Sequence, residues 1–179
     1  MPEVSGKAIE ILFSAEEIAK RNLDLAQMIS GRQFHNLLTI SILKGSFIFA
    51  ADLIRAMHNA GVEPDMEFIT VSSYGAGTTS TEVKLLRDID SDVRDRDVLL
   101  IDDILESGKT LKFVRELMLQ RGARSVSIAV LLDKRMRRQV DIEADFVAFE
   151  CPDYFVVGYG MDVAHSFRQL PYVGRVMED

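Results

Sequence analysis

The sequence predicts an α/β fold with a mostly parallel central sheet flanked by helices, in which all 179 residues form one domain. Apolar runs rich in β-branched residues, typical of strands buried on both faces, recur along the chain. Segments with the apolar spacing of a helix lie between several of these runs. This alternation favours crossover connections, which set successive strands parallel and cover both faces of the sheet.

The elements follow in order from local signals. Ser14 and Glu17 match a capping box, which predicts a helix that begins there and ends at Gly31. Two further helices are predicted over 47–60 and 110–120, each stopped by a glycine. Strands are predicted over 37–43, 66–71, 82–87, 98–102, 125–132, 145–150 and 155–159. The small, polar stretch 74–81 is predicted to be a mobile loop within a long hairpin, and residues 1–7 remain unassigned.

Composition excludes several classes of function. The net charge of -7 argues against a bulk electrostatic grip on nucleic acid. No apolar run approaches the roughly 20 residues of a membrane helix, and no signal peptide is recognisable. The single cysteine, Cys151, fits a cytoplasmic protein without an intrachain disulfide, and we expect it to be buried and without a nucleophilic role. The three histidines lack the spacing of a zinc site.

Charged residues gather where the predicted strands end. In parallel sheets, ligands bind at the carboxyl ends of the strands. Those ends carry Lys44-Gly45, Asp102-Asp103, Asp133-Lys134 and Asp162. The sequence therefore predicts a binding site at this edge of the sheet.

The stretch that begins at Val98, VLLIDDILESGKTL, contains Gly108-Lys109-Thr110 and raises the question of a triphosphate-binding loop. That loop needs a glycine five positions before its Gly-Lys pair, where this chain has Asp103. An aspartate there would place negative charge against a polyphosphate. The pattern therefore argues against a nucleoside triphosphate loop.

The same stretch fits a ligand with a single phosphate. Residues 106–110 form a turn at a helix N-terminus, where free N–H groups and the helix dipole favour one phosphate. Asp102 and Asp103 would face hydroxyl donors or a metal ion. A ribose 5-phosphate with Mg²⁺ nearby would satisfy both the turn and the two aspartates. The alternative from the residues alone is a capped helix that follows two solvated aspartates.

These residues and four other segments resemble the type I phosphoribosyltransferases, and in detail the hypoxanthine (hypoxanthine-guanine) phosphoribosyltransferases. The matching segments are VLLIDDILESGKTL, ISILKGSFIFAADLIR, VSSYGAGTTSTEVKLLRDID, LLDK and DFVAFECPDYFVVGYGMDVAHSFRQLPYVG. They occur in the family's order between about Ile40 and Val176. The resemblance implies a parallel-sheet core over about 37–150 and a small hood made from the N-terminal segment and about 151–179.

The reaction implied is transfer of ribose 5-phosphate from phosphoribosyl pyrophosphate to N9 of hypoxanthine, and of guanine, with Mg²⁺ as cofactor. Asp102 and Asp103 match the acids that hold the ribose hydroxyls, and Glu106 matches an acid near N7, where the family usually has aspartate. Residues implied to contact the phosphates and the sugar are Lys44, Gly45, Ser107, Gly108, Lys109, Thr110 and Arg168. Lys134 matches the donor to the purine O6, and Phe155 and Val156 match the residues that contact the base.

The resemblance also implies metal-binding acids, a closing loop and a cis peptide bond. Asp102, Asp103 and Asp162 match the metal-binding acids, and Ser73 and Tyr74 match a loop that closes over pyrophosphate. The family often has a cis peptide bond at the position of Leu43-Lys44. The basic run Arg135, Arg137 and Arg138 is expected to be a solvated face rather than an RNA site.

The expected partners are the two small substrates and further copies of the chain in a homodimer or homotetramer, with no nucleic acid and no membrane. A non-catalytic regulator that senses phosphoribosyl pyrophosphate with the same fold is the alternative function. Such regulators usually carry an added nucleic-acid-binding domain or a strongly basic face, and this acidic chain shows neither. Glu106 in place of aspartate is the feature that keeps the alternative open.

Overall fold

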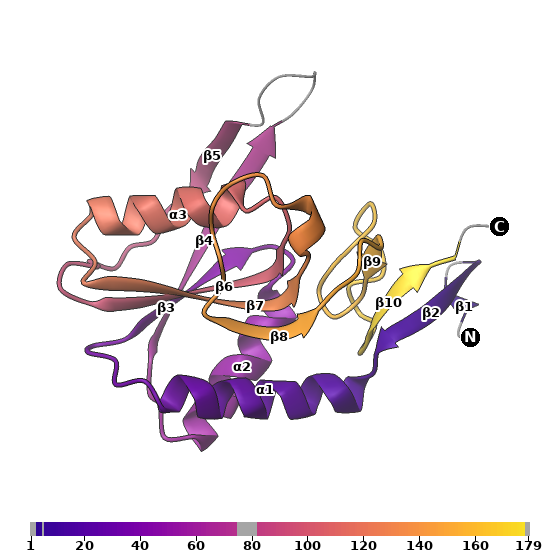
Figure 1. Cartoon of the computed structure of the whole chain (residues 1–179), viewed down its shortest axis with the longest axis horizontal. Helices are drawn as coiled ribbons and strands as arrows, with labels where there is room; N and C mark the ends of the chain where they lie inside the picture. Colours follow the sequence, from indigo (N-terminus) through magenta and orange to yellow (C-terminus); the bar gives the residue numbers. More distant parts are fainter. Residues whose placement is uncertain (1–2, 5, 75–81, 178–179) are drawn as a thin grey trace.

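A six-stranded sheet forms the centre of the computed structural model, which describes residues 3–4, 6–74 and 82–177 (Figure 1). The strand order is β5-β4-β3-β6-β7-β8, and every neighbouring pair is parallel except β4 and β5. The bounds of the strands are β3 Leu38–Leu43, β4 Asp65–Tyr74, β5 Glu82–Arg87, β6 Asp97–Leu105, β7 Ser125–Asp133 and β8 Phe146–Glu150. The predicted α/β class with a mostly parallel sheet is confirmed.

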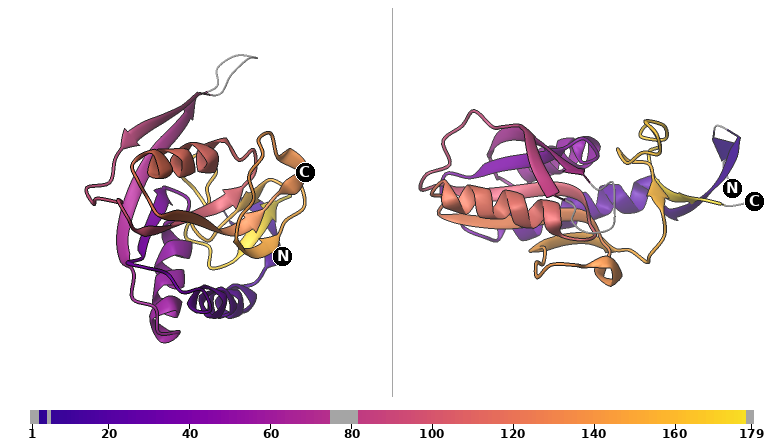
Figure 2. Two further views of the ribbon diagram at one scale, coloured as in Figure 1. Left: turned by 60° about the vertical axis from the view of Figure 1, so that its left-hand side comes forward. Right: turned by 90° about the horizontal axis from the view of Figure 1, so that it is seen from above.

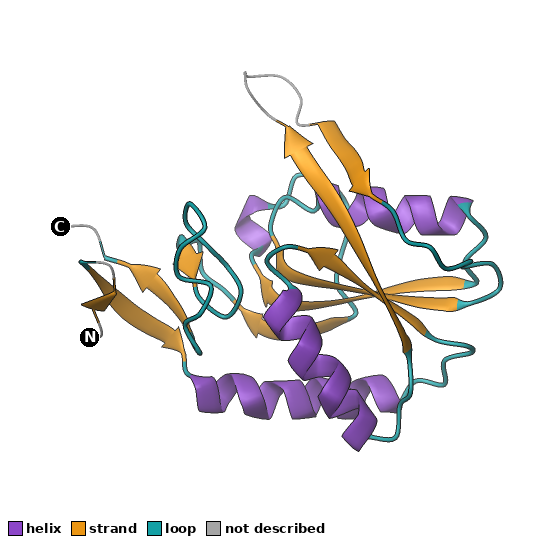
Figure 3. Ribbon diagram, turned by 180° about the vertical axis from the view of Figure 1, so that it is seen from behind, coloured by secondary structure: helices purple, strands orange, loops and turns teal. Residues whose placement is uncertain are grey.

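Helices cover both faces of this sheet (Figures 1 and 3). Helices α1 (Ala15–Ser30) and α2 (Phe47–Asn59) lie on one face, and α3 (Lys109–Gln120) lies on the other. Alternate residues of β6 separate the two layers: Leu99 and Ile101 pack with α1 and α2, whereas Val98 and Leu100 pack with α3. Because both faces are buried, the central strands are apolar almost without interruption, which is the pattern that predicted them.

Helix α1 shows how local sequence sets an element. The Ser14 side chain accepts a hydrogen bond from the Glu17 amide, and the Glu17 carboxylate accepts one from the Ser14 amide at 2.8 Å. This capping box satisfies two amides that have no partner inside the helix. The buried residues Ile18, Leu25 and Ile29 then form the stripe that faces the sheet.

A second, smaller sheet forms the hood. Its strands are β1 Glu3–Val4, β2 Lys7–Phe13, β9 Val156–Val157 and β10 Val173–Val176, in the order β1-β2-β10-β9. It lies beyond the carboxyl ends of the core strands, with both chain ends at its far side (Figure 1), and the view from above in Figure 2 shows the hood and the core side by side. Ile9, Val157, Phe167 and Leu170 form an apolar cluster of its own.

The hood is where the sequence-based assignment differs most from the structure. Residues 7–13 form β2, although no strand was predicted there, and β10 was also missed. The strand predicted over 155–159 shrinks to Val156–Val157 because Gly158 and Tyr159 have positive φ angles of 95° and 49°. Backbone of that kind cannot continue a strand. The loop predicted over 74–81 lies, apart from Tyr74, outside the described residues.

Tyr159 ties the hood to the helices of the core. Its hydroxyl donates to the Asp52 carboxylate of α2 and accepts a hydrogen bond of 2.9 Å from Asn22 Nδ2 of α1. Burial, together with the neighbouring Asp52 carboxylate, raises the pKa of the Tyr159 phenol. The phenol therefore stays protonated and keeps its donor at any ordinary pH. None of the helices in the described part of the chain is long and apolar enough to cross a membrane.

Candidate active site

Two aspartates near the carboxyl end of β6 are the centre of the candidate site. Asp102 is only 7% exposed, and its carboxylate accepts a hydrogen bond from the Asp103 amide at 2.9 Å. The Asp103 carboxylate accepts one from the Ile104 amide at 2.8 Å. Burial and the adjacent Asp103 charge raise the pKa of Asp102 well above its usual range, and burial also raises the pKa of Asp103. Asp102 is buried and Asp103 is half-buried, and neither has an ion-pair partner among the described residues, an arrangement that favours a ligand rather than stability.

The turn that follows β6 faces the same space. Gly108 has a φ of 83°, a conformation that glycine adopts without strain, and a Cβ there would lie 2.5 Å from Ile142 Cγ2. Helix α3 begins at the next residue, so its unpaired amides point towards the turn. The Ser107 hydroxyl accepts a hydrogen bond from the Lys109 amide at 3.3 Å. The turn therefore offers main-chain donors and hydroxyl groups to an anion.

One cleft with two lobes runs past these residues. The turn lobe, a cavity of about 360 Å³, is lined by Asp102, Asp103, Ser107, Gly108 and Thr110 among others. The hood lobe, about 440 Å³, is lined by Lys134, Phe155, Val156, Asp162 and Arg168 among others. Both lobes share Lys44, Gly45, Asp103 and Glu106. A ligand that extends from one lobe to the other would pass directly over Asp103.

The loop after β3 lines both lobes through Lys44 and Gly45. The peptide bond between Leu43 and Lys44 is cis, as the resemblance implied. A Cβ on Gly45 would lie 1.9 Å from Asp103 Oδ2, and a Cβ on Gly160 would lie 2.4 Å from the Gly45 carbonyl oxygen. Gly45 therefore lets the Asp103 carboxylate come close to the β3 loop, and Gly160 lets the hood approach the main chain of that loop.

Lys134 follows β7 directly and is almost completely buried at the edge of the hood lobe. Its ammonium donates to the Tyr154 carbonyl oxygen at 2.6 Å and lies 3.5 Å from Glu106 Oε1. Arg137 Nε lies 4.0 Å from the same Glu106 oxygen. Glu106 thus has two cations beside it, in contrast to Asp102 and Asp103.

The expectation of a solvated basic face is wrong for Arg138. Arg135 and Arg137 are exposed, but the Arg138 guanidinium donates to the carbonyl oxygens of Glu106 at 3.1 Å and Ile142 at 2.5 Å, and it pairs with the Asp133 carboxylate. It therefore fastens the turn after β6 to the end of β7. No pattern in the sequence distinguishes this arginine from its exposed neighbours.

The remaining residues of the hood lobe come from the C-terminal segment. Phe155 is 67% exposed at the rim, whereas Val156 is buried. Arg168 Nη2 pairs with Asp162 Oδ1 at 3.0 Å, and Arg168 Nη1 donates to the Gly160 carbonyl oxygen at 2.5 Å. Asp162 also accepts a hydrogen bond from the His165 amide. The negative charge of Asp162 is therefore largely compensated by Arg168 and the His165 amide, unlike the charges of Asp102 and Asp103.

Most residues selected from the sequence meet in this cleft. Lys109 does not, since it begins α3 and lines neither lobe. Ser73 and Tyr74 lie at the end of β4, paired through their main chains with Val83 and Glu82 of β5. Cys151 is buried, as expected, and burial raises the pKa of its thiol. In the described residues, no group of three His, Cys, Asp or Glu side chains is arranged to hold a metal ion by itself.

Comparison with known proteins identifies the family. The family model for the phosphoribosyl transferase domain matches residues 8–164. The chain belongs to this family.

Relatives of this phosphoribosyl transferase cover nearly the whole chain. A hypoxanthine phosphoribosyltransferase of Salmonella typhimurium is 43% identical over 173 residues, 94% of this chain and 96% of the relative. A hypoxanthine-guanine phosphoribosyltransferase of Bacillus subtilis is 47% identical over 167 residues, 92% of this chain and 91% of the relative.

Solved structures of the family agree in fold. The hypoxanthine phosphoribosyltransferase of Trypanosoma cruzi in complex with its product IMP has a TM-score of 0.89 at 37% identity, covering 99% of this chain and 98% of that one. A hypoxanthine phosphoribosyltransferase from Staphylococcus aureus has a TM-score of 0.88 at 42% identity, covering 94% of this chain and 91% of that one. The phosphoribosyl transferase fold therefore extends over the hood as well as the core.

Proposed function

We propose that this enzyme transfers ribose 5-phosphate from phosphoribosyl pyrophosphate to N9 of hypoxanthine, and of guanine, in purine salvage. The products are IMP or GMP and pyrophosphate. The observation that carries the proposal is the buried Asp102 and the half-buried Asp103, which form no ion pair with the described residues and lie between an anion-binding turn and a buried lysine. That order of groups matches a phosphate, a sugar with two hydroxyls, and a base with an oxo group.

The turn lobe would hold the sugar phosphate. The amides at the start of α3, with the Ser107 and Thr110 hydroxyls, supply donors for the 5-phosphate, and Gly108 lets the main chain come close. Asp102 and Asp103 accept hydrogen bonds from the ribose hydroxyls, and carboxylate–hydroxyl bonds are short and strong. We place Lys109 in this site through its main-chain amide only, since its side chain lines neither lobe.

The hood lobe would hold the base. The Lys134 ammonium can only donate hydrogen bonds. It therefore favours a base with a 6-oxo group and disfavours one with a 6-amino group. The exposed Phe155 ring would stack on the purine, and the Val156 main chain would contact its edge. Glu106, which lines both lobes, is placed to exchange a proton at N7 as N9 attacks C1 of the ribose.

The pyrophosphate would leave between the β3 loop and the hood. Lys44 and Gly45 face it from one side and Arg168 from the other. A planar guanidinium suits phosphate oxygens in a bidentate contact. We assign Ser73 and Tyr74 to closure over the pyrophosphate, which excludes water from a sugar with oxocarbenium character. Bond breaking runs ahead of bond making in this mechanism, so the fixed charges serve mainly to orient the reactants.

The residues present fit Mg²⁺. It prefers one or two carboxylates together with substrate oxygens and retained waters. Asp102 is buried, Asp103 is half-buried, and neither forms an ion pair with a described residue, which leaves both carboxylates available to such an ion. Asp162 would act through water, since Arg168 already pairs with it. When bound, Mg²⁺ would screen the negative charge that develops on the pyrophosphate.

Initial rates with hypoxanthine, guanine, xanthine and adenine test this function. We expect turnover of hypoxanthine and guanine and almost none of adenine, because the Lys134 ammonium would meet the donor of a 6-amino group. Adenine as the best substrate would overturn the assignment of Lys134. Binding of phosphoribosyl pyrophosphate without turnover of any base would favour a regulator instead.

We further propose that residues 1–179 form a single domain that acts in the cytoplasm as a homodimer or homotetramer. A solved Trypanosoma cruzi relative is described in terms of the effect of its C-terminal region on oligomeric state and activity. Here the C-terminal strand β10 pairs with β2 inside the hood. Sedimentation equilibrium of the full chain would give the number of subunits.

A further inference from the structure

Tyr154 lies outside the lining of both lobes, yet its main chain touches a residue of the proposed base site. Its carbonyl oxygen accepts the 2.6 Å hydrogen bond from Lys134 Nζ. Among the described residues, the other polar contact of this ammonium is the longer one to Glu106, at 3.5 Å. The position of the Tyr154 carbonyl therefore determines where one proton of the ammonium points and where its other two remain available.

The Tyr154 ring is held by the hood sheet. Arg175 Cζ lies 4.2 Å from the ring centroid, which is a cation–π contact. The same guanidinium pairs through Nε with the Glu10 carboxylate. Arg175 on β10 faces Glu10 on β2 and Val156 on β9 in the sheet register, so both neighbouring strands fix its position.

The contacts thus form one continuous series from the far side of the hood to the base site. It runs from Glu10 through Arg175 and the Tyr154 ring to the Tyr154 carbonyl and the Lys134 ammonium. Arg175 lines neither lobe of the cleft. Its side chain can therefore act on a bound base through Tyr154 and Lys134, whereas its main chain pairs with Val156 of β9.

We propose that Glu10 and Arg175 are positioning residues for base recognition, because they hold Tyr154 where its carbonyl orients the Lys134 ammonium towards the 6-oxo group. An arginine is required for this. Its planar guanidinium lies flat on the ring while its edge meets a carboxylate, a combination that the compact ammonium of lysine does not provide. The proposal rests on the base-site role given above to Lys134.

Steady-state kinetics of Arg175→Ala, Arg175→Lys and Tyr154→Ala test the proposal. We expect KM for hypoxanthine to rise about three- to tenfold in each, while KM for phosphoribosyl pyrophosphate stays within about twofold of wild type. Tyr154→Phe keeps the ring and should restore the low KM. An unchanged KM for hypoxanthine, or an equal rise in both KM values, would overturn the proposal.

The chain offers a matched control. Arg32 Cζ lies 4.7 Å from the Phe146 ring centroid and pairs with Asp145 at 3.0 Å, which is the same chemistry at the amino end of β8. Arg32→Ala should lower the melting temperature without a selective change in KM for hypoxanthine. If it raises that KM as much as Arg175→Ala does, the effect is general destabilisation and the positioning role is wrong.

A second readout separates this proposal from the proposed function. In ¹⁵N-lysine spectra of the full chain, the Lys134 ammonium should be slowed in exchange by its bond to Tyr154, and Arg175→Ala should remove that protection. A signal that Arg175→Ala leaves unaltered overturns the positioning role. If the wild-type enzyme does not use hypoxanthine, the proposed function fails, while this measurement still decides whether Arg175 holds Lys134.

Discussion

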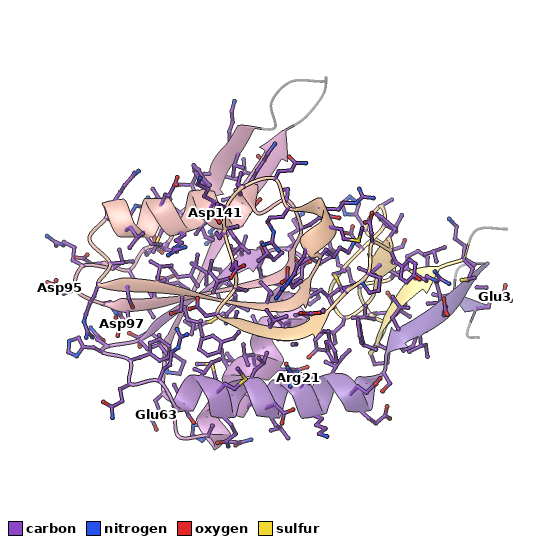
Figure 4. The ribbon with its side chains drawn as sticks, in the orientation of Figure 1. Glu3, Arg21, Glu63, Asp95, Asp97 and Asp141 are labelled. Carbon is purple, nitrogen blue, oxygen red and sulfur yellow. The ribbon has the colours of Figure 1, made fainter. Side chains whose placement is uncertain are left out.

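The two ends of strand β6 carry acids in opposite circumstances. At the amino end, Asp97 accepts hydrogen bonds from the His35 amide at 2.6 Å, the Ser125 hydroxyl at 2.7 Å and Arg124 at 3.1 Å. Burial by itself would raise the pKa of Asp97, but these donors and the Arg124 charge lower it. Figure 4 shows Asp97 at the end of the sheet far from the hood.

At the carboxyl end, Asp102 is buried like Asp97 and Asp103 is half-buried, but within the described contacts their only donors are two amides of their own strand. Their pKa values are raised rather than lowered. Strand β6 thus contains one acid whose carboxylate has three donors from other segments, and two acids whose carboxylates have none within the described contacts. Burial alone therefore does not single out Asp102 and Asp103 as candidate functional acids, whereas burial without compensating donors or cations does.

The largest effect is expected just beyond β6, at Glu106. Glu106→Gln removes the carboxylate that would exchange the proton at N7 and should lower kcat about 100-fold or more, with little change in KM. Single-turnover rates would measure this directly. Glu116→Gln on the exposed face of α3 is the matched control and should retain the wild-type kcat. A kcat unchanged in Glu106→Gln would remove Glu106 from the chemical step.

Asp103→Asn should have the next largest effect. It keeps the shape of the side chain but removes the charge that strengthens a hydrogen bond to the ribose or the binding of Mg²⁺. We expect kcat/KM for phosphoribosyl pyrophosphate to fall about 10- to 100-fold while the fold remains intact. If the rate is unaltered, the ligand does not contact Asp103. The acids at the carboxyl end of β6 would then have no functional role that distinguishes them from Asp97.

Asp97→Asn should give the reverse result. Loss of a buried charged acceptor with three donors should lower the free energy of unfolding by about 1–3 kcal/mol, while kcat of the folded enzyme remains unchanged. Because the pKa of Asp97 in the folded state lies below its ordinary value of 3.8, its contribution to stability is present above that pH and is lost as pH falls through the folded pKa. Urea titrations at pH 7 and near pH 3 should therefore show a smaller difference between variant and wild type at the lower pH.

Asp102→Asn should give the smallest change in stability, and the change should be stabilising. The raised pKa means that the folded state holds a proton which the unfolded state has already released, so this group lowers stability as pH rises above 3.8. The variant lacks that penalty and should melt a few degrees higher at pH 7, with the gap closing towards pH 4. Calorimetry without substrate or Mg²⁺ would measure it. A lower melting temperature at pH 7 would mean that the Asp102 carboxylate has a structural partner.

The core could be predicted from the sequence because its pattern is local. Strands buried on both faces, such as β3 and β6, are long apolar runs, and α1 begins at a capping box that two residues, Ser14 and Glu17, define. The hood follows no such pattern. Its strands have two to seven residues, and β2 pairs with β10 across almost the whole length of the chain. A pairing between the two ends of a sequence leaves no periodicity to find.

The candidate site could likewise be predicted only in part. Asp102, Asp103 and Lys134 stand directly at the ends of apolar runs, so their meeting at one edge followed from a parallel sheet. The burial of Arg138 did not follow, because it depends on the gap between the ends of β6 and β7. Nor did the position of Arg175, since it depends on the register of the hood strands.

The glycine contact below the cleft limits how this enzyme can be redesigned. Gly45 and Gly160 touch through the Gly45 carbonyl oxygen, and neither has room for even one additional carbon atom. Mutant libraries intended to widen the choice of nucleobase should leave both positions constant. Diversity is better introduced at Leu86 and Ile104, which line the hood lobe and are not among the buried core residues.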